Sequence, residues 1–153
     1  MGERMRINSI LAGAVMAAAI NCAYAKCAAG TATVFSCPTS NGKFVEVCDA
    51  GKTLTYSFGK PSGPPEIDLK VPRTEASTTQ WSRTGSNYSC SVEIPNDKAI
   101  YSVFTSMDRL SKKHDLSAGV HVYSGAKRLA TVNCTGKNVK HDLEGIDLKA
   151  TTW

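Results

Sequence analysis

One polar segment carries the residue types best suited to contact another molecule, Arg83-Thr84-Gly85-Ser86-Asn87-Tyr88. Gly85 permits tight backbone bending, Thr84 and Ser86 offer small hydroxyl groups, and Tyr88 places an aromatic ring at the start of the next strand. Such a loop tip is small and polar enough to enter the cleft of a partner protein. The alternative is an ordinary β-turn whose Tyr88 packs at the strand entrance, and the residues alone leave both interpretations open.

Patterns of residues that carry out catalysis are otherwise missing from the sequence. It contains no Gly-x-Ser-x-Gly nucleophile elbow, no His-Glu-x-x-His zinc helix and no Walker-type phosphate loop. His114, His121 and His141 do not form the i,i+4 or i,i+2 pairs with which a helix or a strand holds a metal. We therefore expect no metal, no cofactor and no enzymatic activity, and we interpret the chain as a binding protein.

Four aromatic residues fall on alternating positions of predicted strands: Tyr56, Phe58, Tyr101 and Phe104. On a nucleic-acid-binding barrel such rings stack on bases. Alternation of this kind is more typical of core packing, so we expect no nucleic-acid partner.

The first 25 residues have the organisation of a secretory signal peptide. Arg4 and Arg6 precede the uncharged run 7–20, and Ala23-Tyr24-Ala25 is a small-x-small cleavage signature. The apolar run is shorter than the roughly 20 residues of a membrane-spanning helix, and no later segment is longer. We expect cleavage near Ala25, a periplasmic or secreted location, and a mature chain without a transmembrane segment.

The mature chain, residues 26–153, has the length of a single domain. The signal holds Arg4, Arg6 and Glu3, so 16 basic and 12 acidic residues remain, which gives a net charge of +4. This mild positive charge is scattered along the chain and indicates no specific anionic partner.

Export favours disulfide bonds, and removal of Cys22 with the signal leaves five cysteines. We predict bridges from Cys37 to Cys48, across a local hairpin, and from Cys90 to Cys134, between strands distant in sequence. Cys27 is then left over as a free thiol, an intermolecular link or a competitor for Cys37. The connectivity, and with it a covalent dimer, stays open at this level.

Hydrophobic residues alternate with a period of two along most of the mature chain, which is the pattern of half-buried strands. Asn41-Gly42 between two such runs predicts a hairpin with a type I′ turn. Met107, Leu110 and His114 are spaced three and four apart, which predicts a short helical turn, or alternatively an excursion loop, near 106–116. The expected fold is all-β: a single antiparallel β-barrel or β-sandwich of about eight strands, stabilised by disulfides. The predicted strands are 33–37, 43–48, 52–58, 66–71, a strand around Trp81, 88–94, 98–106, 119–123 and 128–134.

The final segment, 136–153, contains Leu143, Ile146, Leu148 and Trp153 among polar residues. These apolar side chains suggest a tail that docks onto the domain, in a role that spacing does not define.

The segment Thr84-Gly85-x-x-Tyr88 resembles the Ser-Gly-x-x-Tyr motif of bacterial membrane-bound and periplasmic inhibitors of c-type lysozyme, with Thr in place of Ser. The similarity extends over residues 35–94 through four further short elements in the same order. These elements are Phe35-Ser36-Cys37, Asn41-Gly42-Lys43, Leu54-Thr55-Tyr56-Ser57-Phe58 and Val71-Pro72-Arg73.

The resemblance implies inhibition without catalysis. The Thr84 hydroxyl and the backbone near Gly85 and Ser86 would enter the sugar-binding cleft and hydrogen-bond to the two catalytic carboxylates, while Tyr88 would brace the loop. The alternative is a periplasmic envelope-associated interaction protein or a toxin-immunity protein that does not bind lysozyme. Both expectations require a protein partner and no enzymatic site. A third alternative is a periplasmic enzyme with a novel site, whose sign would be a deep pocket that holds perturbed carboxylates or a histidine.

Overall fold

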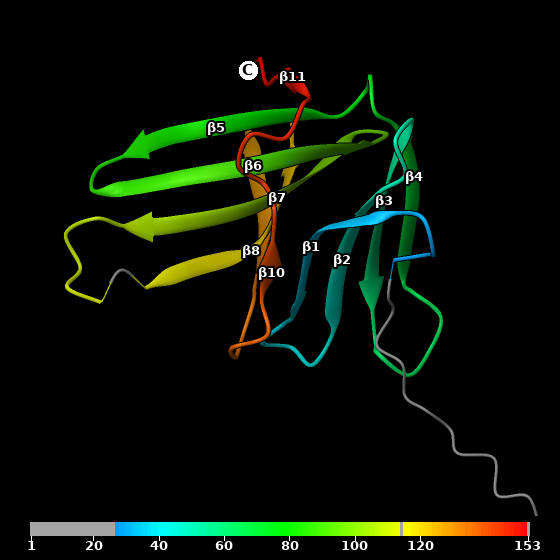
Figure 1. Cartoon of the computed structure of the whole chain (residues 1–153), viewed down its shortest axis with the longest axis horizontal. Coiled ribbons are helices and arrows are strands. Elements are labelled where there is room, and N and C mark those ends of the chain that lie inside the picture. The colour runs from blue at the N-terminus through cyan, green and yellow to red at the C-terminus, as the bar shows by residue number, and fades with distance from the viewer. Residues whose placement is uncertain (1–26, 114, 153) are drawn as a thin grey trace, which may run out of the picture.

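The computed structural model describes residues 27–113 and 115–152, in which eleven strands form two sheets (Figure 1). The predicted signal peptide and its cleavage site lie outside these residues. The five-stranded sheet has the order β10-β1-β2-β3-β4, and all of its neighbours are antiparallel. Its strands are β1 (Ala32–Pro38), β2 (Phe44–Asp49), β3 (Thr53–Gly59), β4 (Ile67–Pro72) and β10 (Lys140–His141).

The six-stranded sheet has the order β11-β5-β6-β7-β8-β9, and only the short β11–β5 pair is parallel. Its strands are β5 (Ser77–Thr84), β6 (Asn87–Asn96), β7 (Ala99–Asp108), β8 (Leu116–Ser124), β9 (Lys127–Asn133) and β11 (Lys149–Ala150). The all-β prediction is confirmed. Neither sheet closes into a barrel.

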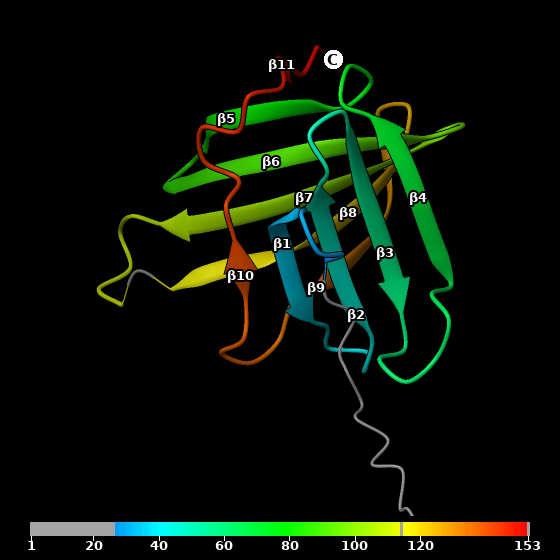
Figure 2. The same cartoon turned by 45° about the vertical axis from the view of Figure 1, so that its right-hand side comes forward.

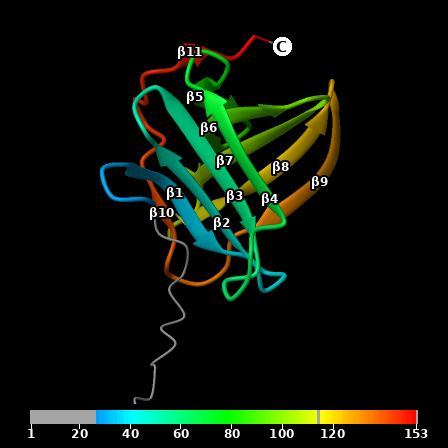
Figure 3. The same cartoon turned by 90° about the vertical axis from the view of Figure 1, so that its right-hand side faces the viewer.

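The two sheets pack face to face with their strands running crosswise, as Figures 2 and 3 show. Both sheets contribute to one hydrophobic core, in which Phe35 and Leu54 of one sheet and Val92 and Val103 of the other are fully buried. Burial of this apolar surface is the main favourable contribution to folding. The six-stranded sheet extends beyond the five-stranded one, so the ends of β5 to β8 near the 84–87 and 108–116 connections project from the sandwich (Figure 1).

Strand alternation follows the sequence closely. In β3, Leu54 and Tyr56 are buried and Phe58 packs against the core, as predicted. In β6 the inward residues include Val92 and Ile94, whereas Ser91 and Glu93 lie on the opposite face.

The predicted helical turn near 106–116 is wrong. Strand β7 continues through Asp108, and residues 109–113 form turns before β8 begins at Leu116. Met107 pairs with Tyr88 on one side and with Leu116 on the other, so the sheet ladder uses its backbone. Asp108 Oδ1 then accepts a hydrogen bond from the Leu110 N–H at 3.0 Å, a local contact typical of turns.

The β1–β2 hairpin is present, but its turn is not type I′. Gly42 has φ +75°, while Asn41 does not have the positive φ that a type I′ turn also requires. The Gly42 N–H donates to the Thr39 carbonyl at 3.0 Å, and the Lys43 N–H donates to Thr39 Oγ1 at 3.1 Å. A five-residue connection with a left-handed glycine therefore reverses the chain.

Two disulfides form, with a connectivity different from the predicted one: Cys27–Cys48 and Cys37–Cys134. Cys37 lies opposite Val45 in the β1–β2 register. Cys48 is three residues further along β2 than Val45, which corresponds to about 10 Å along the strand. Cys90 lies on β6 and is separated from the β9 end at Cys134 by β7 and β8, a distance of about 14 Å across three strand spacings. Both predicted pairs are too far apart to bond.

Cys27 is consequently paired and not left over, and Cys90 is the free, buried cysteine of the described chain. Cys134 lies beside β1 because Thr39 and Cys134 form an isolated antiparallel bridge. The Cys37–Cys134 bond therefore joins the end of β9 to the five-stranded sheet.

The C-terminal segment docks onto the domain as predicted. Of its four apolar residues, Trp153 lies outside the described part of the chain. Leu143 is fully buried, and Ile146 and Leu148 pack against the core. Gln80 holds this segment to β5, donating to the Leu143 carbonyl at 2.7 Å and accepting from the Gly145 N–H at 3.0 Å. The tail thus runs from β10 on one sheet to β11 on the other and links the two (Figure 1).

Candidate functional site

The predicted contact loop is the β5–β6 hairpin, which lies at the projecting end of the six-stranded sheet (Figure 1). Thr84 pairs with Asn87, so Gly85 and Ser86 form a two-residue turn. Gly85 has φ +61°, which is expected of the glycine in the first position of a type II′ turn. The Arg109 N–H donates to the Ser86 carbonyl at 3.1 Å, which fastens the hairpin to the β7–β8 connection.

The sheet divides the predicted site residues between its two faces. Thr84 and Asn87 line a groove on the face turned away from the five-stranded sheet. Tyr88, the next residue along β6, lies on the other face in register with Arg83 and Met107. The structure thus gathers Thr84, Gly85 and Ser86 in one turn but places the Tyr88 ring behind it.

Tyr88 is half-buried and is the centre of a group that we call the arginine-aromatic cluster, whose other members are exposed: Trp81, Arg83, Tyr88 and Arg109. The guanidinium carbons of Arg83 and Arg109 lie 5.0 Å and 4.5 Å from the centre of the Tyr88 ring. Trp81 meets the same ring edge-on at 6.4 Å, and its side chain is 56% exposed. Contacts between guanidinium groups and aromatic faces are attractive and hold the long arginine side chains in place.

Neither Arg83 nor Arg109 takes part in the ion pairs found in the described part of the chain. The two ion pairs found there join Lys43 to Glu66 and Arg73 to Asp49, in the other half of the molecule. Exposed apolar side chains lie at the same end of the sheet, because Met107 pairs with Tyr88 and Leu116 pairs with Met107, and Met107 and Leu116 are each at least 40% exposed. The projecting end therefore combines two arginine side chains with exposed aromatic and aliphatic surface.

Sequence reasoning identified Tyr88 and the turn but missed Trp81 and Arg109 as neighbours. Arg109 lies 21 residues after Tyr88, and only the β6–β7 pairing brings them together. Trp81 is exposed because a bulge between Thr79 and Ser82 gives it φ +53° and turns it out of the ladder. An irregular strand position of this kind leaves no signal in hydrophobic alternation.

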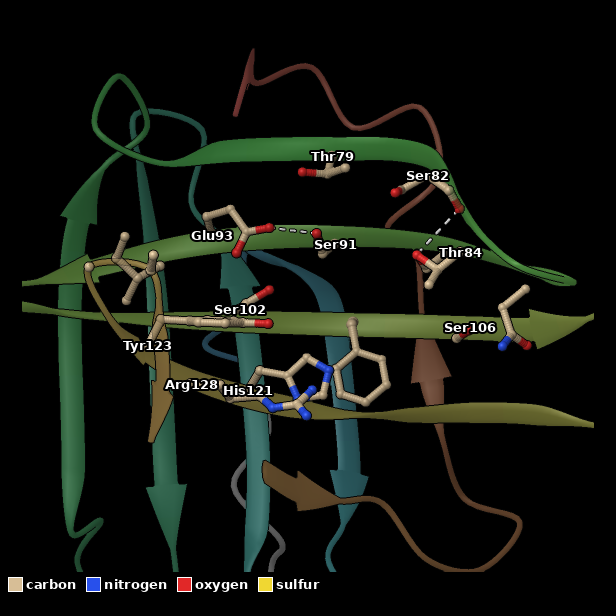
Figure 4. A pocket seen from close by; sticks show the side chains of 16 residues that line it. Thr79, Ser82, Thr84, Ser91, Glu93, Ser102, Ser106, His121, Tyr123 and Arg128 are labelled. Carbon is tan, nitrogen blue, oxygen red and sulfur yellow. Dashed lines mark hydrogen bonds between the residues drawn. The ribbon is translucent and has the colours of Figure 1, made fainter. Parts of the chain in front are cut away.

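The second candidate region is the outer groove, a hollow of about 970 Å³ on the face of the six-stranded sheet away from the core (Figure 4). Its floor comes from β5, β6, β7 and β8, and the 125–128 segment borders it. Eight of its sixteen lining residues carry hydroxyl groups, which come from serines, threonines and Tyr123. Side chains pointing outward along several neighbouring strands thus build one polar surface.

Glu93 lies on the floor of this groove and is only 4% exposed. The Ser91 hydroxyl donates to Glu93 Oε1 at 2.5 Å, while Oε2 is buried without a hydrogen-bond partner. Burial raises the pKa of this carboxyl above its ordinary value, and the Ser91 and Ser102 hydroxyl groups only partly oppose that effect. A buried carboxyl with an unfilled oxygen is costly and is a frequent feature of ligand sites.

His121 and Phe104 form a stacked pair in the same groove, with ring centres 4.1 Å apart and planes 8° from parallel. His121 Nδ1 lies 2.9 Å from Thr131 Oγ1, which fixes the ring. Burial, and to a smaller extent the charge of Arg128, lowers the pKa of His121, so the ring is neutral at pH 7. Phe104, which we expected in the core, instead belongs to the groove.

Among the described residues, one group of side chains resembles a metal site. Cys27, Glu46 and Cys48 bring their ligand atoms within 4.8 Å of one another, but the two sulfurs are bonded together and offer no thiolate. Burial raises the pKa of Glu46, although the Cys27 N–H and Lys140 act in the opposite direction. His121 and His141 lie on different sheets, and His114 lies outside the described residues.

In comparisons with protein-family models, curated proteins and solved structures, no match to this chain was found. No helix in the described part of the chain is long and apolar enough to cross a membrane. The two surfaces of the projecting end are therefore interpreted from their own geometry and chemistry.

Proposed function

We propose that this protein is an exported binding protein that inhibits a peptidoglycan-cleaving lysozyme by inserting the β5–β6 hairpin into the enzyme's active-site cleft. The arginine-aromatic cluster beside the hairpin tip is the observation that carries the proposal. Its residue types, Trp, Tyr and Arg, are those that contribute most to affinity in protein interfaces.

The shape of the hairpin suits insertion. Its turn consists of two residues, is exposed at Gly85 and projects beyond the body of the sandwich (Figure 1). Because Gly85 has no side chain, its backbone can approach the wall of a narrow cleft. The bond from the Arg109 N–H to Ser86 orders the tip before binding, which lowers the entropic cost of association.

The electrostatics of the tip suit a cleft that holds two carboxylates, which is how glycoside-cleaving enzymes are built. Arg83 and Arg109 present charged donors next to the hairpin, and the Thr84 hydroxyl adds a neutral one on the opposite face of the sheet. A guanidinium group donates two parallel hydrogen bonds to a carboxylate with a geometry that a lysine cannot reproduce. In this arrangement Tyr88 positions the arginines and does not itself need to reach the carboxylates.

Export agrees with the two disulfides, which persist in oxidising compartments. The net charge of +4 on the mature chain favours a second candidate, because c-type lysozymes are basic and long-range attraction between the two proteins would be absent. An acidic partner would be attracted to the same tip, as in an envelope-associated interaction protein or a toxin-immunity protein. Both candidates use the same surface and differ in the partner.

Lysis of bacterial cell walls by c-type lysozyme, followed as loss of turbidity, tests the proposal. The purified disulfide-bonded protein should slow lysis, and Arg83→Ala with Arg109→Ala should raise the concentration needed by about tenfold or more. A matched control, Lys70→Ala with Lys127→Ala, removes the same charge from exposed positions outside the cluster and should leave inhibition unchanged.

Unchanged lysis in the presence of the native protein rejects lysozyme as the partner. Capture of an acidic envelope protein by the native chain, with loss of capture in the Arg83→Ala/Arg109→Ala variant, would then support the second candidate. Equal losses in the cluster variant and the lysine control would reject the hairpin tip as the contact surface in either case.

A further inference from the structure

The floor of the outer groove, a hollow of about 970 Å³, takes no part in the proposed hairpin insertion. We propose that this groove binds an uncharged saccharide, with Glu93 and the surrounding hydroxyl groups hydrogen-bonding to sugar hydroxyls and the Phe104–His121 pair contacting a ring. The proposal concerns the opposite face of the sheet from Tyr88 and does not depend on the partner of the hairpin.

The size and lining of the groove match a ligand of a few sugar rings. Its volume of about 970 Å³ lies at the upper end of the range for small-molecule sites, roughly 300–1,000 Å³. Hydroxyl side chains are both donors and acceptors, so a floor of serines and threonines complements a molecule whose own polar groups are hydroxyls. These side chains come from neighbouring strands of one sheet (Figure 4).

Glu93 gives the floor its strongest acceptor. Glu93 is 4% exposed, and Oε2 has no hydrogen-bond partner while Oε1 already accepts from Ser91 at 2.5 Å. Leaving a buried carboxyl oxygen without a donor is unfavourable by itself. A sugar hydroxyl that reaches Glu93 supplies this donor, and Figure 4 shows Glu93 beside Ser91 and Ser102 among the side chains that line the groove.

The aromatic pair provides the apolar contact that sugar recognition also needs. Phe104 and His121 stack at 4.1 Å, and Tyr123 meets His121 edge-on at 6.0 Å. The neutral His121 ring has Nδ1 engaged with Thr131, so Nε2 is the nitrogen available to a ligand. The C–H face of a sugar ring packs against such surfaces without any charge.

The charges in the groove favour an uncharged ligand over an ionic one. Glu93 and Arg128 are its acidic and basic side chains, and they balance each other. A polyanion would meet the Glu93 carboxyl on the floor, and a polycation would meet Arg128 at the border. Neither finds the excess of opposite charge that would compensate for its own desolvation.

Isotope-labelled protein titrated with four uncharged trisaccharides, of glucose, mannose, galactose and N-acetylglucosamine, tests the proposal by amide chemical shifts. At least one trisaccharide should give saturable shifts confined to the groove strands at concentrations up to about 10 mM, which covers millimolar dissociation constants. Glu93→Gln replaces the unfilled acceptor by an N–H donor of the same shape and should weaken binding about tenfold.

Two controls separate this outcome from the hairpin proposal. Tyr88→Ala, on the opposite face, should leave saccharide binding unchanged whether or not the hairpin binds lysozyme. Spermidine and inorganic phosphate serve as cationic and anionic probes and should cause no saturable shifts in the groove. Absence of shifts with all four trisaccharides, binding of either ionic probe in their place, or unaltered binding by Glu93→Gln would overturn the proposal.

Discussion

The two disulfides close loops of very different length, and this difference predicts which of them stabilises the fold more. Cys37–Cys134 spans a sequence separation of 97, whereas Cys27–Cys48 spans 21. In the chain-entropy account the longer loop restricts the unfolded chain more, by about 4.7 kcal/mol against about 3.3 kcal/mol at 25 °C. The expected difference is therefore about 1.4 kcal/mol, a factor of about ten in the folding equilibrium.

The perturbation is a pair of double variants, Cys37→Ala/Cys134→Ala and Cys27→Ala/Cys48→Ala. Each removes one bridge and two sulfurs, and so the comparison cancels most of the change in side-chain volume. Urea unfolding followed by circular dichroism gives the free energy of unfolding of both variants and of the native protein. The first variant should be the less stable of the two.

Location in the fold acts in the same direction as loop length. Cys37 is fully buried and its bond ties β9 to the five-stranded sheet, while Cys27 precedes β1 and holds only the start of the described chain. Equal stability of the two variants, or greater loss from Cys27→Ala/Cys48→Ala, would refute the reasoning. A Cys90-containing bridge in a non-reducing peptide map would refute the connectivity itself.

Three further predictions follow from the core and the groove. Gly119→Ala places a Cβ 2.3 Å from the Val132 carbonyl oxygen and should lower the free energy of unfolding by about 2 kcal/mol, whereas Gly63→Ala, with open space around it, should not. Burial raises the pKa of Glu93 in the folded state, so the resulting destabilisation is absent well below pH 4.5, grows as pH rises from there toward the folded pKa and is complete above it. Glu93→Gln should therefore gain urea resistance relative to the native protein as pH rises above 4.5, and a difference that does not change with pH would contradict this. The Cys90 thiol, 3% exposed, should react with a thiol reagent only after unfolding, and fast labelling of the folded protein would show that it is accessible.

Strand positions are accessible from the sequence because alternation is a local property. Leu54 and Tyr56 point inward as their spacing predicts, and the boundaries of β3 and β4 differ from the predicted ones by one residue. Met107 shows the limit of this approach, because its three- and four-residue spacing to Leu110 and His114 imitates a helix. Pairing with Tyr88 and Leu116 decides in favour of the strand.

Non-local geometry accounts for the parts that could not be predicted. The partner of Cys37 depends on β9 returning beside β1, which no spacing along the chain reveals. The groove depends on which outward faces the sheet places together, so Glu93 and Phe104 had no signal that distinguishes them from other strand residues. The contact of Arg109 with Tyr88 arises in the same way.

Complex formation between the purified disulfide-bonded protein and c-type lysozyme, measured by isothermal titration calorimetry, tests the central claim most directly. The account predicts a saturable one-to-one complex that Arg83→Ala/Arg109→Ala weakens and the lysine control does not. The claim would be contradicted if mixing the two proteins gave no heat change and if they eluted separately in gel filtration.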